Sequence, residues 1–379
     1  MNFNGLLKNT NVNSCIECGK CTGNCPVSRF NPNFSPRKLL STFFNNDQDK
    51  LLQNELIWSC LTCGMCRVRC PMDVKFTDFT KIIRQKALKT GTEANCAHGG
   101  ALQSMMKIMT SENLNQNKME WITDDLEISE TGEILFFVGC LPYFDTFFNE
   151  LKVDTLAIAK SAIHILNVLG IKPVILKNER CCGHDLLWAG DVDNFKKLAE
   201  ENITEINKIK PRKIIFSCAE CYRTFKLDYQ ELMGPFDFEM MHLSEFISEK
   251  MENNNLGLKK VEGCVTYHDP CRLGRHLGVY EPPRKILNAI PDLKYVEMPK
   301  NKVNAVCCGT NLWINCDKYS RMIQNYRLKM GRQVGSNIML TSCPKCYIHF
   351  TCAMQGEQIP DKEKIIVKDL AVFTAEAME

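Results

Sequence analysis

Twenty-two cysteines in a chain of 379 residues constrain this sequence more than any other feature, because eighteen of them fall into regular spacings. A chain of this length does not need disulfides for stability, and its N-terminus shows no secretory signal pattern. We therefore expect a cytoplasmic protein with reduced thiols. Regularly spaced reduced thiols indicate metal ligands rather than scattered core residues.

The first eight of these cysteines form two copies of one pattern, Cys15-x2-Cys18-x2-Cys21-x3-Cys25-Pro26 and Cys60-x2-Cys63-x2-Cys66-x3-Cys70-Pro71. This is the bacterial ferredoxin motif, in which the fourth cysteine of each run crosses to the other [4Fe–4S] cubane. The motif predicts a first ferredoxin set of Cys15, Cys18, Cys21 and Cys70, and a second ferredoxin set of Cys25, Cys60, Cys63 and Cys66. Zinc sites instead use pairs of Cys-x2-Cys separated by longer gaps.

The other ten cysteines form an internal repeat. The first CCG set is Cys140, Cys181, Cys182, Cys218 and Cys221, and the second CCG set is Cys271, Cys307, Cys308, Cys343 and Cys346. Five cysteines are one more than a cubane needs, and adjacent cysteines point their thiolates in different directions. Each set therefore favours an iron–sulfur cluster that is not a plain cube. A vicinal disulfide and a zinc site with an idle fifth cysteine are the alternatives for a single copy.

The pattern of apolar residues predicts alternating strands and helices in each repeat. In the first copy, strands are expected at 133–138, 172–176 and 213–217, with helices at 153–169 and 191–208. This order predicts a parallel sheet in each half, with the cysteines just beyond the carboxyl ends of the strands. We expect a mainly α-helical ferredoxin-like domain (1–110), a polar linker (111–132) and two pseudo-symmetric α/β domains (133–255 and 256–379).

The ferredoxin-like domain is expected to contain a helix near residues 77–89. Its basic side chains, including Lys81 and Arg84, are predicted to form a solvated face.

The cysteine repeat resembles the cysteine-rich CCG domain family. A two-cubane ferredoxin domain followed by two such domains resembles the catalytic iron–sulfur subunit of heterodisulfide reductase in its fused D-type form, which is equivalent to the C-type and B-type subunits joined. The segment 14–26 is similar to the first motif of the C-type subunit, and Ile57-Trp-Ser-Cys with Cys70-Pro-Met-Asp-Val-Lys resembles the second.

The resemblance implies two cubane and two non-cubane [4Fe–4S] clusters, the latter on the first and second CCG sets. It implies an oxidoreductase of methanogenesis that reduces the mixed disulfide of coenzyme M and coenzyme B (CoM-S-S-CoB) between the two CCG sets. The implied electron donor is a flavoprotein of the heterodisulfide reductase A type or a membrane b-type cytochrome.

A few residues near the cysteines are candidates for proton transfer and substrate binding. B-type subunits can carry a histidine directly after the first cysteine of the second motif, where this chain has Arg272. His268 and His276 could supply the proton instead, since imidazole titrates near neutral pH. Arg272 and Arg275 could pair with a sulfonate or phosphate of the substrate. Each of these residues, like His184, could equally pack a cluster loop.

The remaining cysteines fall outside every motif, and we expect them to be buried thiols: Cys96, Cys264, Cys316 and Cys352.

Two other functions remain open from the sequence. Iron–sulfur subunits of glycolate, lactate and glycerol-3-phosphate dehydrogenase complexes have a similar layout and only relay electrons. Subunits of thiol-driven fumarate reductases are a third class, although that family usually carries an additional N-terminal [2Fe–2S] domain. A formal charge of +3 excludes a strongly basic nucleic-acid binder. The sequence has no stretch of 18 apolar residues and no G-x-G-x-x-G after a strand, so we expect no membrane span and an external electron source.

Overall fold

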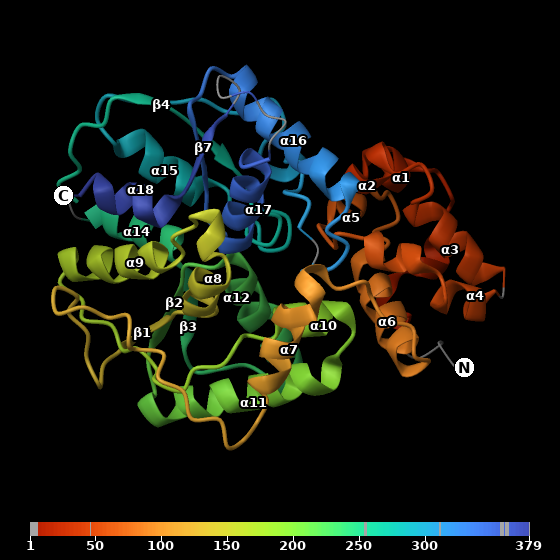
Figure 1. Cartoon of the computed structure of the whole chain (residues 1–379), viewed down its shortest axis with the longest axis horizontal. Coiled ribbons are helices and arrows are strands. Elements are labelled where there is room, and N and C mark those ends of the chain that lie inside the picture. The colour runs from red at the N-terminus through yellow and green to blue at the C-terminus, as the bar shows by residue number, and fades with distance from the viewer. Residues whose placement is uncertain are drawn as a thin grey trace.

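The computed structural model describes residues 7–45, 47–253, 256–310, 312–356, 360 and 364–378. Figure 1 shows a helical N-terminal part on one side and two α/β parts, one above the other, on the opposite side. No helix in the described ranges is long and apolar enough to cross a membrane.

The N-terminal part is built from short helices wrapped around the ferredoxin motifs. Pro26 and Pro36 occupy the first turn of two of these helices, where a missing N–H costs nothing, and the Ser35 side chain caps the second by accepting from the amide of Lys38. The helices are α1 (Lys20–Asn24), α2 (Pro26–Phe30), α3 (Pro36–Phe44), α4 (Gln48–Leu52), α5 (Met65–Arg69), α6 (Phe76–Lys89) and α7 (Ala101–Ile108), with short 3-10 turns at Lys8–Thr10, Val12–Ser14, Glu55–Ser59 and Ala97–Gly100.

The first α/β part contains a three-stranded parallel sheet in the order β1-β2-β3. Its elements are β1 (Ile134–Phe137), α8 (Leu141–Phe147), α9 (Leu156–Val168), α10 (His184–Ala189), α11 (Val192–Ile209), β2 (Lys213–Phe216), α12 (Ala219–Arg223), α13 (Gln230–Met233), β3 (Glu239–His242) and α14 (Leu243–Asn253). The segment 172–176 does not form the expected strand. Val174 makes only isolated bridges to Leu135 and Ser129, and the neighbouring Pro173 has no N–H to donate to a ladder.

The second α/β part contains a four-stranded parallel sheet in the order β5-β4-β6-β7. Its elements are β4 (Gly263–His268), α15 (Glu281–Ala289), β5 (Leu293–Tyr295), α16 (Lys318–Gln333), β6 (Ile338–Thr341), α17 (Pro344–Met354), β7 (Ile366–Asp369) and α18 (Leu370–Glu376). The central strands β4 and β6 are buried and apolar, as expected for a parallel sheet that is covered on both faces.

The two α/β parts share one apolar core. Helices α9 and α18 pack together, as do α14 and α15, and the buried side chains of Phe136, Ile163, Val265, Leu287 and Phe373 belong to the same cluster. In both halves the cysteine loops follow directly after strands, because Cys140 and Cys218 come after β1 and β2, and Cys271 and Cys343 come after β4 and β6.

Arg84 connects the N-terminal part to the first α/β part. The expectation that Arg84 lies on a solvated face is wrong, since its side chain is fully buried. Its guanidinium donates to the carbonyls of Ile57, Trp58 and Cys60 and, across the junction, to the carbonyl of Trp188 at 3.0 Å. Arg84 therefore fixes the loop that leads into the second ferredoxin motif against α10.

Candidate metal centres

The first ferredoxin set lies near the surface of the N-terminal part. All four of its cysteines line one cavity, together with Pro71 and residues of the first motif. Cys18 is exposed, and the neighbouring Ile16 is 61% exposed. The backbone amide of Val74 donates to Cys70 Sγ at 3.4 Å, which is a contact that suits a thiolate ligand. This set is open to a partner from outside.

The second ferredoxin set lies deeper in the structure. Cys60, Cys63 and Cys66 are buried, and Cys25 lies close enough to Cys60 and Cys63 to interact with them electrostatically. The amide of Thr62 donates to Cys60 Sγ at 3.4 Å. Burial raises the pKa of the Cys66 thiol well above its ordinary value, so coordination rather than titration would make it a thiolate.

The first CCG set forms a continuous chain of thiol contacts. Hydrogen bonds join Cys140 to Cys181, Cys181 to Cys182, Cys182 to Cys221 and Cys221 to Cys218. The preceding glycine is required by this closeness, because a Cβ on Gly139 would lie 3.1 Å from Cys221 Sγ and the residue has a φ of +68°.

A buried ion pair fixes the loop before Cys140. Lys118 Nζ lies 2.7 Å from Glu179 Oε1, and the Glu179 carboxylate accepts the backbone amides of Val138 and Gly139. Lys118 comes from the segment that the sequence suggested was a polar linker, and its side chain is 2% exposed. Neither residue was expected from the sequence, since an isolated lysine in a polar segment carries no local signal of burial.

The second CCG set has the same arrangement of contacts. Cys271 is hydrogen-bonded to Cys307, Cys307 to Cys308, Cys308 to Cys346 and Cys346 to Cys343. The Cys307 thiol also contacts Cys63 of the second ferredoxin set. The two sets therefore adjoin directly, sulfur to sulfur.

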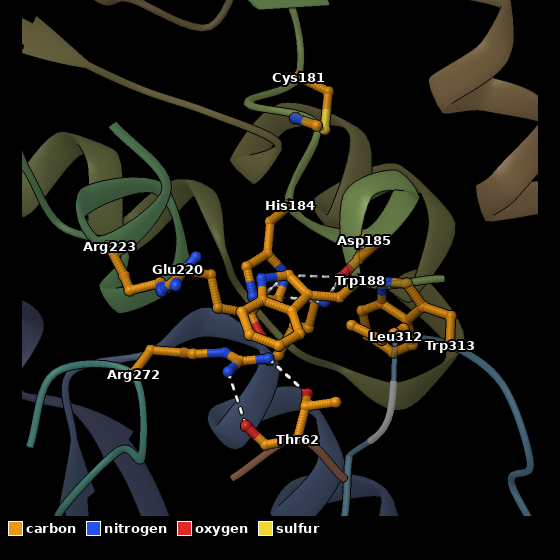
Figure 2. A network of polar contacts seen from close by, with 12 residues as sticks. Thr62, Cys181, His184, Asp185, Trp188, Glu220, Arg223, Arg272, Leu312 and Trp313 are labelled. Carbon is orange, nitrogen blue, oxygen red and sulfur yellow. Dashed lines mark hydrogen bonds and ion pairs between the residues drawn. The ribbon is translucent and has the colours of Figure 1, made fainter. Parts of the chain in front are cut away.

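A buried network of charged side chains lies between the two CCG sets (Figure 2). Lys345 forms ion pairs with Asp185 and, at 2.8 Å, with Glu220 Oε2. His184 Nδ1 lies 2.9 Å from Asp185 Oδ1 and 3.7 Å from Glu220 Oε2. Cys343 interacts electrostatically with Glu220 and Cys218, so this network marks the place where the two sets approach each other.

Sequence reasoning missed Lys345, Glu220 and Asp185, although a signal for two of them was present. Glu220 is the third residue of Cys-Ala-Glu-Cys in the first repeat, and Lys345 is the third residue of Cys-Pro-Lys-Cys in the second. Aligning the repeats on their cysteines places opposite charges at one equivalent position. If the halves face each other, these charges are expected to pair.

Arg272 lies at the edge of this network, where Figure 2 shows its guanidinium beside Trp188 and Thr62. Its Nη1 and Nη2 donate to the carbonyl and hydroxyl of Thr62 at 2.7 and 2.6 Å, and its Cζ is 4.4 Å from the centroid of the Trp188 ring. Much of the donor capacity of Arg272 is therefore used inside the protein.

The two predicted proton donors lie in different surroundings. His268 lies beside the second CCG set, with its ring within 4.8 Å of the Cys308 and Cys346 sulfurs, and its Nδ1 accepts from Arg327 Nε at 3.0 Å. His276 lies on the ferredoxin-like part instead, between Arg272 and the carbonyl of Thr62. Burial lowers the pKa of both imidazoles, and the nearby positive charges of Arg272 and Arg223 contribute further for His276.

The four cysteines outside the motifs are not buried, so that expectation is wrong. Cys316 is exposed and the other three are half-buried. No disulfide joins any of the 22 cysteines, so the vicinal-disulfide alternative for Cys181 and Cys182 does not occur in the structure.

The four sulfur sets fit iron–sulfur clusters. Each set brings at least four sulfur atoms together, with backbone amides directed at Sγ atoms in three of them, as in the 3.4 Å contact from Gly183 to Cys181. Thiolates with amide donors are the ligands that such clusters prefer. The order of the sets in space, from an exposed one to two buried ones that face each other, suits the transfer of electrons inward.

Family models match three segments of the chain. A 4Fe-4S dicluster domain matches residues 14–75, and the CCG cysteine-rich domain matches residues 134–226 and 265–351. The D-type subunit of the dihydromethanophenazine-dependent CoB–CoM heterodisulfide reductase of Methanosarcina barkeri is 30% identical over 271 residues, which are 69% of this chain and 63% of that protein. The chain thus spans less than two thirds of the length of this relative.

Two further relatives match nearly the whole chain. An uncharacterized iron–sulfur protein of Methanococcus maripaludis is 29% identical over 96% of this chain and 71% of its own. The B-type subunit of the fumarate reductase (CoM/CoB) of Methanothermobacter marburgensis is 26% identical over 95% and 71%. The crystal structure of a hypothetical protein from Helicobacter pylori has the same fold, with a TM-score of 0.60, 12% identity, and coverage of 93% of this chain and 71% of that one.

The chain therefore belongs to the iron–sulfur oxidoreductases that join a 4Fe-4S dicluster domain to two CCG domains. Within this class it is homologous to the D-type subunit of heterodisulfide reductase and to related iron–sulfur proteins at about 30% identity.

Proposed function

We propose that this chain is the catalytic iron–sulfur subunit of a heterodisulfide reductase, which reduces CoM-S-S-CoB to two thiols. The reaction takes up two electrons and two protons and breaks the S–S bond. The proposed domains are a ferredoxin-like domain (1–110), a linker (111–132) and two CCG domains (133–255 and 256–379). The proposed ligands are the two ferredoxin sets for two cubanes and the two CCG sets for two non-cubane [4Fe–4S] clusters.

One observation carries the proposal: both CCG sets are complete, and they approach each other across a buried seam. Cys218 and Cys343 are electrostatic neighbours, and the ion pair of Glu220 with Lys345 lies beside them. When bound, the two non-cubane clusters would each supply one of the two electrons that a disulfide needs. A subunit that only relays electrons has no need of two complete sets facing each other.

The placement of the sulfur sets favours one direction of electron flow. Cys18, in the exposed first ferredoxin set, is accessible to an external donor. The second ferredoxin set follows, and its Cys63 contacts Cys307 of the second CCG set. We propose that the donor is a flavoprotein of the heterodisulfide reductase A type or a membrane b-type cytochrome, and that electrons reach the second CCG set before the first.

The chain's own residues supply charge and protons at the seam. A small cavity beside the second CCG set is lined by Lys345, Glu220 and Arg272, with Leu61 and Leu312 limiting access of water. The Lys345 ammonium would stabilise the negative charge that develops on a departing thiolate sulfur. His268 is the nearer of the two histidines to the second CCG sulfurs, and we propose it as the proton donor. Arg272 is the proposed substrate contact closest to both sets.

Anaerobic purification with the partner subunits, followed by iron counting and a thiol-release assay, tests the proposal. We expect about 16 iron atoms per chain if four four-iron clusters form, and release of two thiols per CoM-S-S-CoB. The variant Cys308→Ser is expected to lose iron and thiol release together. The matched control Cys316→Ser changes an exposed cysteine outside every set and is expected to retain both.

Full iron content without thiol release would refute the proposed reaction. The alternative would then be an electron-transfer subunit of a flavin-linked dehydrogenase of the glycolate, lactate or glycerol-3-phosphate type. Such a subunit would be reduced by its flavoprotein in the presence of that dehydrogenase's substrate.

A further inference from the structure

A cavity of about 290 Å³ lies at the junction of the ferredoxin-like part and the second CCG part, away from the Lys345 network. Helices α2 and α5 form one side of it, and α16 with the loop before it forms the other; α2 and α16 lie side by side in Figure 1. Cys25 of the second ferredoxin set and Cys307 of the second CCG set both line it. An occupant would therefore contact two of the four sulfur sets.

The charged side chains that line this cavity are all positive. They are Arg29, Arg69, Arg275 and Lys300, and no aspartate or glutamate is among the described lining residues. None of these four cations takes part in an ion pair with a carboxylate in the described part of the chain. Four uncompensated cations around one small cavity create a strong attraction for an anion.

Two guanidinium groups also have buried N–H donors that lack an acceptor. Arg275 donates Nε to the carbonyl of Cys63 at 2.7 Å and Nη1 to the carbonyl of Ala305, but its Nη2 is buried without a partner. Arg69 donates Nη2 to the side chain of Asn304, and its buried Nε has no partner. A buried donor without an acceptor is costly, so both groups are suited to an oxyanion that enters the cavity.

The other two cations lie on an aromatic ring at the side of the cavity. Arg29 Cζ is 4.5 Å and Lys300 Nζ is 5.8 Å from the centroid of the Tyr326 ring, and Phe30 packs edge-on against the same ring. These cations stack on a ring rather than on cysteine sulfur, so their charge is not explained by the metal centres alone. The aromatic wall adds an apolar surface for a short hydrocarbon stem.

We propose that this cavity binds a small molecule that carries a tetrahedral oxyanion, a phosphate or a sulfonate, on a short apolar stem. Guanidinium groups match such oxyanions in geometry as well as in charge. The volume is at the lower end of the range for small-molecule sites, which restricts the occupant to a compact ligand. The proposal does not depend on the reaction at the CCG sets. The oxyanion can come from the end group of a disulfide substrate or from a separate soluble ligand.

Anaerobic calorimetric titration of the iron-loaded chain with butylphosphonate tests the site. We expect saturable binding of one molecule per chain, and no binding of butyltrimethylammonium. Arg69→Gln removes one charged donor and is expected to weaken binding about tenfold or more. The matched control is Arg67→Gln, which changes an exposed arginine on the same helix that pairs with Asp73 outside the cavity. It is expected to bind as the wild type does.

A second variant keeps the test independent of folding. Lys300→Gln alters a half-buried cation at the other side of the cavity and is expected to weaken binding with unchanged iron content. Failure of the iron-loaded wild type to bind butylphosphonate, or equal affinity of Arg69→Gln and Arg67→Gln, would overturn the proposal. Repeating the wild-type titration with CoM-S-S-CoB present identifies the source: displacement indicates a substrate end group, and unchanged binding indicates a separate ligand.

Discussion

At the scale of single residues, Lys345 has the largest burden of charge in the described chain. Its ammonium is buried, with a side-chain exposure of 4%, and it compensates two carboxylates, Asp185 and Glu220. Removing one member of such a group leaves the others buried without compensation, which is more costly than losing an exposed pair. The pKa of Asp185 is held well below its ordinary value, against the effect of burial, by the nearby Lys345 and by the hydrogen bond from His184.

We expect Lys345→Met to lower the free energy of unfolding by about 3–5 kcal/mol, as measured by anaerobic urea denaturation. The double variant Lys345→Met with Glu220→Gln should recover part of this loss, because it removes one of the uncompensated charges. The exposed pair of Lys368 with Glu376 provides the control, and Lys368→Met should cost no more than about 1 kcal/mol. Equal losses for the two lysine variants would show that the network does not stabilise the fold.

Asp369 gives the chain a pH-dependent stability. Burial raises its pKa from 3.8 to about 7, and one oxygen of its carboxyl has no hydrogen-bond partner. The folded chain therefore holds this proton more tightly than the unfolded chain. The contribution to stability is complete below about pH 4 and is lost as the pH rises through about 7.

Asp369→Asn should remove this dependence while keeping an oxygen to accept the amide of Ala371. At pH 8.5 we expect the variant to be more stable than the wild type, by on the order of 2–4 kcal/mol, with a much smaller difference at pH 5.5. Urea denaturation at the two pH values measures this. Asp317→Asn, at the exposed cap of α16, is the control and should behave alike at both. A gain for Asp369→Asn that is equal at the two pH values would contradict the assignment.

At the scale of elements, the joint between α6 and α10 holds the ferredoxin-like part to the first CCG part. Gly190 ends α10 with a φ of +96°, and a Cβ there would lie 2.5 Å from the backbone nitrogen of Gln85 in α6. Only glycine allows the two backbones to approach this closely. The same joint carries the hydrogen bond from Arg84 to Trp188.

Gly190→Ala is therefore expected to cost on the order of 2–4 kcal/mol of unfolding free energy, from backbone strain and from forced separation of the two helices. Gly170→Ala is a suitable control, because Gly170 has a similar φ of +75° but no heavy atom near the added Cβ. It should cost about 1 kcal/mol. If the two alanine variants are equally stable, the close approach of α6 and α10 does not contribute.

Much of the fold could be predicted from the sequence, because the repeated cysteine spacings and apolar runs are local signals. They indicated β1, β2, α9 and α11 to within a few residues. The segment 172–176 was misjudged because its apolar pattern conceals the effect of Pro173 on pairing. The strands β3 and β7 were not anticipated, since each is only four residues long.

The grouping of sulfurs within each motif was accessible from spacing, but the contacts between groups were not. Burial of Arg84 and Lys118 depends on segments that are distant in sequence, so neither could be inferred from its neighbours. The same holds for the contact of Cys63 with Cys307, which joins two motifs 244 positions apart in the sequence.

At the scale of the whole molecule, bound clusters would reverse the sign of the net charge. The sequence carries a formal +3 and has an isoelectric point of about 8.0. An oxidised cubane with its four thiolates carries about −2, so two cubanes alone would bring the total to about −1. We expect the iron-loaded chain to focus at a more acidic position than the iron-stripped chain in anaerobic isoelectric focusing. Identical positions would indicate that the ferredoxin sets do not bind cubanes.

The opposite charges at equivalent positions of the two repeats also determine which modules can associate. Two identical copies meeting at this seam would bring glutamate against glutamate, or lysine against lysine, in a buried environment where like charges repel strongly. Glu220 with Lys345 is the combination that avoids this conflict. The duplicated halves are thus no longer interchangeable, and each discriminates in favour of its tethered neighbour and against a second copy of itself.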